Sequence, residues 1–202
     1  RLPERFQAKV KRGQRATVLG FEALLRWQHP TLGPVGPGEF VPIAEANGMI
    51  VPLGEWVLRE SCERLVHWRK VRPALRMSVN LSARQLASVD AVERLCQVLG
   101  SSGLPPGAVE LELTETLLVD RSDTMLARLH HLRKAGFGLA IDDFGTGYSS
   151  LAYLDSFPIT TLKIDRAFVN NLSGAAHGDA IARAIVAIGD ALEVEVIAEG
   201  IE

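Results

Sequence analysis

Short apolar runs alternate with longer amphipathic stretches along the chain, and this alternation limits the folds that the chain can adopt. The apolar runs predict strands at residues 18–27, 76–81, 109–114, 137–142, 161–165 and 194–198. A further strand over residues 6–10 is expected to run outside this series. Strands that alternate with helices pair in parallel through right-handed crossovers, in an open sheet or a closed barrel. The sequence therefore predicts a parallel α/β fold.

The stretches between these runs predict helices with one apolar face. They cover residues 54–70, 90–99, 123–135 and 179–192. In the last of them, Ile181, Ile185 and Ile188 recur at helical spacing, which indicates one buried stripe. Gly136 follows the third helix and is expected to end it in the left-handed conformation. The Gly/Pro-rich residues 32–38 predict a loop inside the domain.

Composition and charge exclude some classes of protein. With 202 residues, 47% of them hydrophobic, the chain can bury one substantial core. Its net charge of −2 does not favour duplex nucleic acid as a partner. Cys62 and Cys96 lack metal-site spacing and are expected to be reduced thiols. No apolar run approaches the roughly 20 residues of a membrane span, and the start is polar, unlike a signal peptide. We therefore expect a cytoplasmic domain, whose parent protein could still be membrane-anchored through other segments.

Polar side chains stand at or near the ends of six predicted strands. They are Glu22, Asn80, Glu112 with Glu115, Asp142 with Asp143, Lys163 and Glu199. In a parallel barrel the carboxyl ends of the strands form the rim where active sites are built. Carboxylates that converge there repel one another and need a compensating cation. The positions of these residues therefore predict a metal site.

The donor types indicate which cation and which chemistry. Carboxylates with one amide, and without cysteine or histidine, favour Mg²⁺ or Mn²⁺ over Zn²⁺. The adjacent Asp142 and Asp143 could serve two ions, which suits in-line hydrolysis of a phosphodiester. Lys163 could orient the attacking water or offset charge in the transition state. Any single strand-end acid could instead only cap the following helix. Taken together, the residues predict a metal-dependent phosphoryl or acyl hydrolase, without a choice of substrate.

Six motifs in a fixed order carry a family resemblance. They are EALLR at 22–26, SVNLS at 78–82, ELELTE at 110–115, DDFGTG at 142–147 followed by YSSL, LKID at 162–165 and AEGIE at 198–202. In these motifs the chain resembles the EAL domain, a family of cyclic-di-GMP phosphodiesterases built on a TIM-like (β/α) barrel. The resemblance covers nearly the whole chain. It implies a hydrolase of bacterial signalling that cleaves one phosphodiester bond of cyclic-di-GMP and releases linear pGpG.

The resemblance implies which residues hold ligands. The expected ligands of two Mg²⁺ or Mn²⁺ ions are Glu22, Asn80, Glu112, Asp142 and Asp143. Asp142 is expected to bridge the two ions. Gln7 and Arg26 are expected to contact substrate phosphate, although Ala8 stands where the family usually has proline.

The resemblance also implies catalytic roles. Lys163 is expected to hold the attacking water, and Glu199 to assist its deprotonation. Glu115 resembles the acid that pins the DDFGTG loop, and Glu202 is expected to support the catalytic groups.

The resemblance further implies how the domain is organised. Residues 1–202 are expected to form one EAL domain of the TIM-like type that lacks its C-terminal strand and helix. A homodimer is expected, and the full protein is expected to carry sensory or GGDEF-type domains. A different class of function stays open, a receptor that binds cyclic-di-GMP or a protein partner without cleavage. Inactive members typically lose the EAL glutamate, the DD pair or the lysine, and this chain keeps all of them.

Overall fold

The computed structural model describes residues 4–11, 17–119, 122–146, 151–170 and 176–200. Its strands are β1 (Glu4–Lys11), β2 (Thr17–Leu25), β3 (Trp27–His29), β4 (Gly33–Val35), β5 (Arg76–Asn80), β6 (Val109–Thr114), β7 (Gly138–Phe144), β8 (Thr161–Ile164) and β9 (Glu195–Ala198). Its α-helices are α1 (Pro37–Asn47), α2 (Ile50–Arg69), α3 (Ala83–Ala87), α4 (Val89–Ser102), α5 (Asp123–Ala135), α6 (Arg166–Asn170) and α7 (Ala176–Ala191). Short 3₁₀ helices cover Glu115–Val119 (η1) and Leu151–Ser156 (η2). Strands and helices alternate as the sequence predicts.

The chain forms two compact units. The first comprises residues 1–111 with 134–137, and the second comprises residues 112–133 with 138–202. Strand β6 passes from the first unit to the second after Leu111.

In the first unit the strands lie in the order β1-β2-β5-β6. β1 is antiparallel to β2, which confirms that residues 6–10 run outside the parallel series. β2 is parallel to β5, with Glu22 opposite Ser78. Beside the start of β6, the Met77 N–H donates to the Ala108 carbonyl at 2.9 Å.

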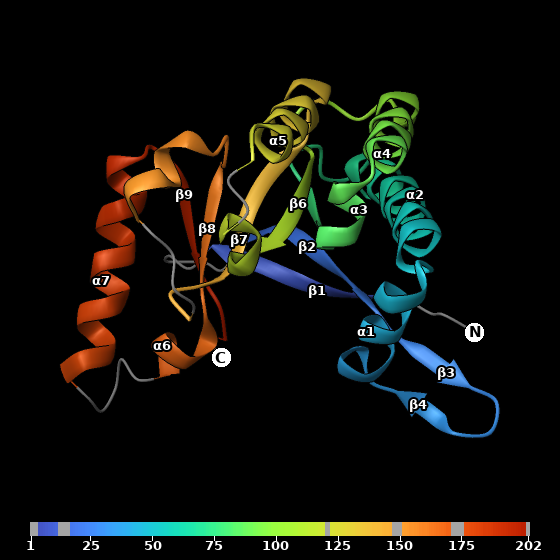
Figure 1. The fold of residues 1–202 in the computed structure, drawn as a ribbon, viewed down its shortest axis with the longest axis horizontal. Coiled ribbons are helices and arrows are strands. Elements are labelled where there is room, and N and C mark those ends of the chain that lie inside the picture. Colours follow the sequence, from blue (N-terminus) through green and yellow to red (C-terminus); the bar gives the residue numbers. More distant parts are fainter. Residues whose placement is uncertain (1–3, 12–16, 120–121, 147–150, 171–175, 201–202) are drawn as a thin grey trace. The chain divides into compact units, whose positions relative to one another are not determined.

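Helices α2 and α4 pack side by side, and α2 also contacts β5 (Figure 1). Leu58 of α2 and Met77 of β5 are fully buried, and each such side chain stabilises the fold by roughly 2 kcal/mol. The Trp68 ring packs against Phe6 and Phe21, with centroid distances of 4.9 and 4.7 Å. This apolar layer holds α2 against the strands that carry Glu22 and Asn80.

The two cysteines are free thiols, as expected from their spacing. Burial raises the pKa of Cys62 to about 12 and that of Cys96 to about 11. Both thiols therefore stay protonated near neutral pH and are poor nucleophiles.

Residues 32–38 do not form the simple loop that their glycines and prolines predict. Gly33–Val35 is strand β4, which pairs with β3 in an antiparallel hairpin. Helix α1 then begins at Pro37, because a residue without an N–H loses nothing in the first turn of a helix. The predicted strand 18–27 is likewise interrupted at Arg26, between β2 and β3.

In the second unit β7, β8 and β9 are parallel neighbours in that order. Helix α7 packs against β8 and β9, and α6 packs against α7 (Figure 1). Leu139, Ile141 and Leu162 are fully buried in these strands. Among the described residues, no helix is both long enough and apolar enough to cross a bilayer.

One predicted helix boundary is confirmed and another is wrong. Helix α5 spans the predicted residues and is followed by Gly136 at a φ of 106°, which confirms the left-handed end. Helix α2 begins at Ile50, four residues before the predicted start, because Pro52 in its first turn is compatible with a helix.

We predict that Gly20→Ala destabilises the first unit. A Cβ at this position would lie 2.4 Å from the carbonyl oxygen of Arg76, so β2 and β5 would have to separate. We expect the free energy of unfolding in urea to fall by about 2 kcal/mol or more. Gly100→Ala is the matched control, because its Cβ would meet no atom within 4 Å on an exposed helix position. That variant should gain roughly 0.5–1 kcal/mol. Equal effects of the two changes would contradict this reading of Gly20.

Candidate metal site at the strand ends

The predicted site residues lie in the C-terminal part of their strands or directly after them. Glu22 lies in β2, Asn80 ends β5, Glu112 lies in β6, Asp142 and Asp143 lie in β7, Lys163 lies in β8, and Glu199 follows β9. Glu22 and Asn80 belong to the first unit, and the others to the second. Each group is held by contacts of its own.

In the first unit, Glu22 and Asn80 are direct partners. The Asn80 side-chain amide donates to Glu22 Oε1 at 3.2 Å. The strand register explains the contact, since Glu22 lies opposite Ser78 and Asn80 is the next residue on the same face of β5. Gln7 on β1 lies opposite Glu22 and is exposed. The Arg26 guanidinium donates to the Leu25 carbonyl at 2.9 Å.

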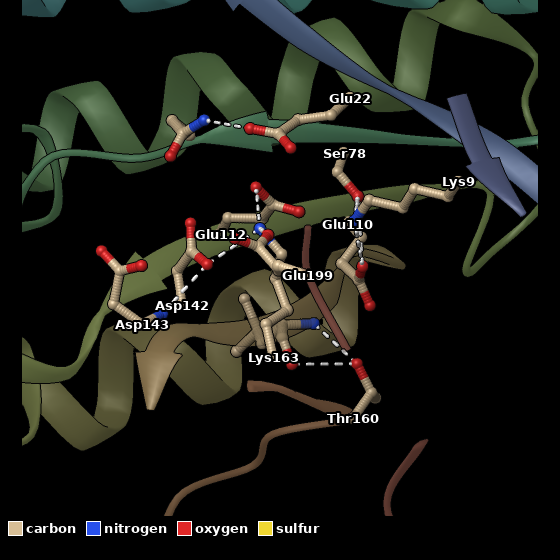
Figure 2. Close-up of polar contacts among 12 residues, drawn as sticks. Lys9, Glu22, Ser78, Glu110, Glu112, Asp142, Asp143, Thr160, Lys163 and Glu199 are labelled. Carbon is tan, nitrogen blue, oxygen red and sulfur yellow. Dashed lines mark hydrogen bonds and ion pairs between the residues drawn. The ribbon is translucent and has the colours of Figure 1, made fainter. Parts of the chain in front are cut away.

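In the second unit, Lys163 is the centre of the site. Its ammonium lies 2.7 Å from Glu199 Oε1, 2.9 Å from Asp142 Oδ1 and 3.0 Å from Glu112 Oε2 (Figure 2). The Lys163 side chain is 1% exposed and that of Glu112 is fully buried. Buried like charges are stable only with an opposite charge beside them. Lys163 therefore supplies the positive charge that holds these three carboxylates together.

Asp142 and Asp143 are adjacent, although neighbouring residues of a regular strand point to opposite faces. The pairing of β7 with β8 shifts register between Ile141 and Phe144, as at a β-bulge. Asp143 has a φ of 53°, a left-handed conformation that aspartate tolerates better than most residues. Bulges of this kind redirect side chains beside functional sites.

The bulge brings carboxylates together in a way that suits a cation. Ligand oxygens of Asp142, Asp143 and Glu199 all lie within 4.8 Å of one another. Desolvation raises the pKa of Asp143 to about 6, with further contributions from Asp142, Asp165 and Glu199. An all-oxygen donor set of this charge fits a hard divalent cation such as Mg²⁺ or Mn²⁺.

Glu115 holds the loop that follows these aspartates. The Gly145 N–H donates to Glu115 Oε2 at 2.9 Å. Glu115 is buried and is the first residue of η1. The Thr146 hydroxyl donates to the Asp143 carbonyl at 2.8 Å within the same loop. These two contacts fix the backbone directly after Asp142 and Asp143.

Asp165 is a further residue of the site, to which the sequence motifs alone assign no role. Asp165 hydrogen-bonds the Asp143 side chain and accepts the Ala167 N–H at 2.7 Å. Its signal in the sequence is the one shared by the other acids, a carboxylate at the end of a strand. Glu202 and residues 147–150, which belong to the DDFGTG motif and the YSSL that follows it, lie outside the described residues.

Comparison with known proteins agrees with this fold. The EAL domain family matches residues 4–202. The bifunctional diguanylate cyclase/cyclic di-GMP phosphodiesterase MucR of Pseudomonas aeruginosa is 45% identical over 92% of the chain and 27% of MucR. Cyclic di-GMP phosphodiesterase PdeR of Escherichia coli is 40% identical over 93% of the chain and 28% of PdeR. The chain thus spans about a quarter of the length of these relatives.

Solved structures give the same result. The PaMucR phosphodiesterase in complex with c-di-GMP superposes with a TM-score of 0.90 at 41% identity, over 100% of this chain and 81% of that one. The EAL enzyme Bd1971, bound to cAMP and cyclic-di-GMP, superposes with a TM-score of 0.88 at 34% identity. The match covers 100% of this chain and 55% of the Bd1971 chain.

Fold and site together define a parallel α/β protein of TIM-like type with an acidic site at its strand ends. The chain belongs to the EAL domain family.

We predict that Lys163→Met strongly destabilises the protein in EDTA. The change would leave Glu112 buried beside two other carboxylates without their counter-charge, which costs about 3–5 kcal/mol. Urea unfolding followed by circular dichroism measures the loss. Arg59→Met is the matched control, because Arg59 forms an exposed ion pair with Glu55 at 3.0 Å. The control should lose about 1 kcal/mol or less, and an equally small loss for Lys163→Met would refute the counter-charge role.

We predict that Glu115→Ala frees the loop after β7. Loss of the charged acceptor removes a hydrogen bond that contributes roughly 1.5–3 kcal/mol, so the Gly145 amide should exchange with solvent faster by about tenfold or more. NMR hydrogen exchange of Gly145 measures the change. Glu115→Gln keeps an acceptor and should show a smaller effect. Unchanged exchange in the alanine variant would mean that other contacts hold the loop.

Proposed function

We propose that this EAL domain hydrolyses one phosphodiester bond of cyclic-di-GMP to give linear pGpG. The observation that carries the proposal is the placement of Lys163 among Glu112, Asp142 and Glu199 beside the bulged Asp143. Relatives at 40–45% identity are named cyclic di-GMP phosphodiesterases. The family's characteristic acids and lysine are all present in this chain.

We propose that the site takes two Mg²⁺ or Mn²⁺ ions. The residues that would hold them are Glu22, Asn80, Glu112, Asp142 and Asp143. When bound, such ions lower the pKa of a coordinated water and offset negative charge on the phosphate. Asp142 and Asp143 have carboxylate oxygens within 4.8 Å of each other and of Glu199, which supports their part of this assignment.

Lys163 and Glu199 are the proposed proton-handling pair. Lys163 Nζ, as a donor, would orient the attacking water and stabilise charge that develops on the phosphoryl oxygens. Glu199 Oε1 lies 2.7 Å from that ammonium, so a proton removed from the water would pass to a carboxylate already beside the nucleophile. Lys163 is buried, which restricts the movement of its ammonium group.

Other residues are proposed to bind substrate or to support the site. Gln7 and Arg26 would contact phosphate oxygens of cyclic-di-GMP, as the family resemblance implies. Glu115 would act through the loop that follows Asp142 and Asp143, and Glu202 would support the catalytic groups.

We further propose that residues 1–202 act as one EAL domain of a cytoplasmic signalling protein. The named relatives are several times longer than this chain, which supports fusion to other domains such as sensory or GGDEF-type domains. A homodimer is proposed as the working assembly, with cyclic-di-GMP as the ligand.

Linear pGpG formation from cyclic-di-GMP with Mn²⁺ present tests the proposal, with the chain measured alongside a version extended past Glu202. We expect Glu22→Ala to lower kcat/KM by more than about 100-fold. Even the loss of a residue that only hydrogen-bonds a metal ligand lowers metal affinity or activity by roughly 10–100-fold. Glu63→Ala, which removes an exposed acid of α2, is the matched control and should retain full activity.

Two other results would overturn the proposal. Binding of cyclic-di-GMP without turnover, by both lengths, would identify a receptor. Turnover that survives Glu22→Ala would place the chemistry elsewhere in the chain.

A further inference from the structure

A second polar cluster with little exposure lies in the first unit. It consists of Lys9 on β1, Ser78 on β5 and Glu110 on β6 (Figure 2). The Lys9 ammonium donates to Ser78 Oγ at 2.5 Å and lies 3.6 Å from Glu110 Oε2. The Ser78 hydroxyl donates to the same Glu110 oxygen at 3.2 Å. The side chains of Lys9 and Glu110 are only 16% and 8% exposed.

The Lys9 side chain reaches this cluster by crossing a whole strand. In the order β1-β2-β5, strand β2 lies between Lys9 and Ser78. Lys9 is opposite Gly20 on β2, and paired residues of an antiparallel ladder share one face. Gly20 has no side chain, and the site of a Cβ there is closed by the Arg76 carbonyl oxygen at 2.4 Å. The close approach of β2 to β5 at this point therefore requires glycine at position 20.

The cluster is in register with the proposed metal ligands. Residues two apart on a strand face the same side, so Glu22 follows Gly20 and Asn80 follows Ser78 on the face of the cluster. Glu112 follows Glu110 on β6 in the same way. Ser78 and Glu110 lie two residues before Asn80 and Glu112, and Lys9 is paired with Gly20, two residues before Glu22. The cluster therefore connects the strand positions that precede three proposed ligands.

Stability alone does not account for a charged pair at this place. Moving two charges out of water costs several kcal/mol each, and apolar residues of similar volume are often as stabilising or more so. A hydrogen-bonded ion pair has a narrower geometry than an apolar contact. It therefore adds a polar constraint on the sliding of one strand against the next to the constraint that the apolar pattern already imposes.

We propose that Lys9 is a positioning residue that, with Ser78 and Glu110, sets the register of β2 and β5 for divalent-cation binding by Glu22 and Asn80. This inference rests on the metal site of the proposed function. In this proposal the cluster acts through the strands and not by direct contact with the cation or the substrate.

The test is Mn²⁺ binding by the double variant Lys9→Met with Glu110→Gln. Both changes keep side-chain size and remove the two charges together, so that no single charge is left buried. Isothermal titration calorimetry should show Kd raised by about tenfold or more, as for groups that orient metal ligands. The midpoint of thermal unfolding in EDTA should stay level or rise. Arg59→Met with Glu55→Gln removes the exposed pair of α2 and should leave Kd within about twofold.

The outcomes separate this inference from the function on which it rests. If the unaltered chain binds Mn²⁺ and the double variant binds it equally well, the positioning role is wrong and the proposed function stands. If the unaltered chain binds no Mn²⁺, both fall. Should the double variant not fold, Ser78→Ala replaces it, since that change removes only the hydroxyl between Lys9 and Glu110. An unchanged Kd in Ser78→Ala would then overturn the inference, and a raised Kd would support it.

Discussion

A buried ammonium among three carboxylates is the interaction on which the second unit's site depends. Glu112, Asp142 and Glu199 come from three separate segments, and carboxylates this close repel one another unless a positive partner lies among them. Lys163 lies on β8, between β7 and β9, and so can reach the acids that both neighbours present. The choice of strand for the lysine is thus as important as the choice of residue.

The two-residue period of the strands separates supporting groups from proposed ligands. On β2, β5 and β6 one position carries glycine, serine or a paired glutamate, and the next position on that face carries Glu22, Asn80 or Glu112. β7 departs from this rule at its bulge, where two consecutive residues serve the site. A regular pleat therefore supplies one proposed ligand per strand, and an irregularity supplies the additional one.

The sequence predicts most of the strands and larger helices because their apolar periodicity is strong, as in α5 and β6. It fails at the hairpin β3–β4 and at α1, where proline and glycine indicate a loop although their positions are compatible with regular structure. Strand-end acids locate the candidate site, because parallel strands bring their ends together. The bulge at Asp142 and the Lys9 contact depend on pairing between strands, which single-strand patterns do not contain.

The crossing of β2 by Lys9 couples positions that lie on three different strands. The Lys9 ammonium on β1 has an acceptor in Ser78 on β5 and a counter-charge in Glu110 on β6. In chimaeras assembled from segments of different EAL domains, β1, β5 and β6 would therefore have to come from the same parent. A junction placed between β1 and β5 would combine a lysine from one parent with strands that lack its acceptor and its counter-charge.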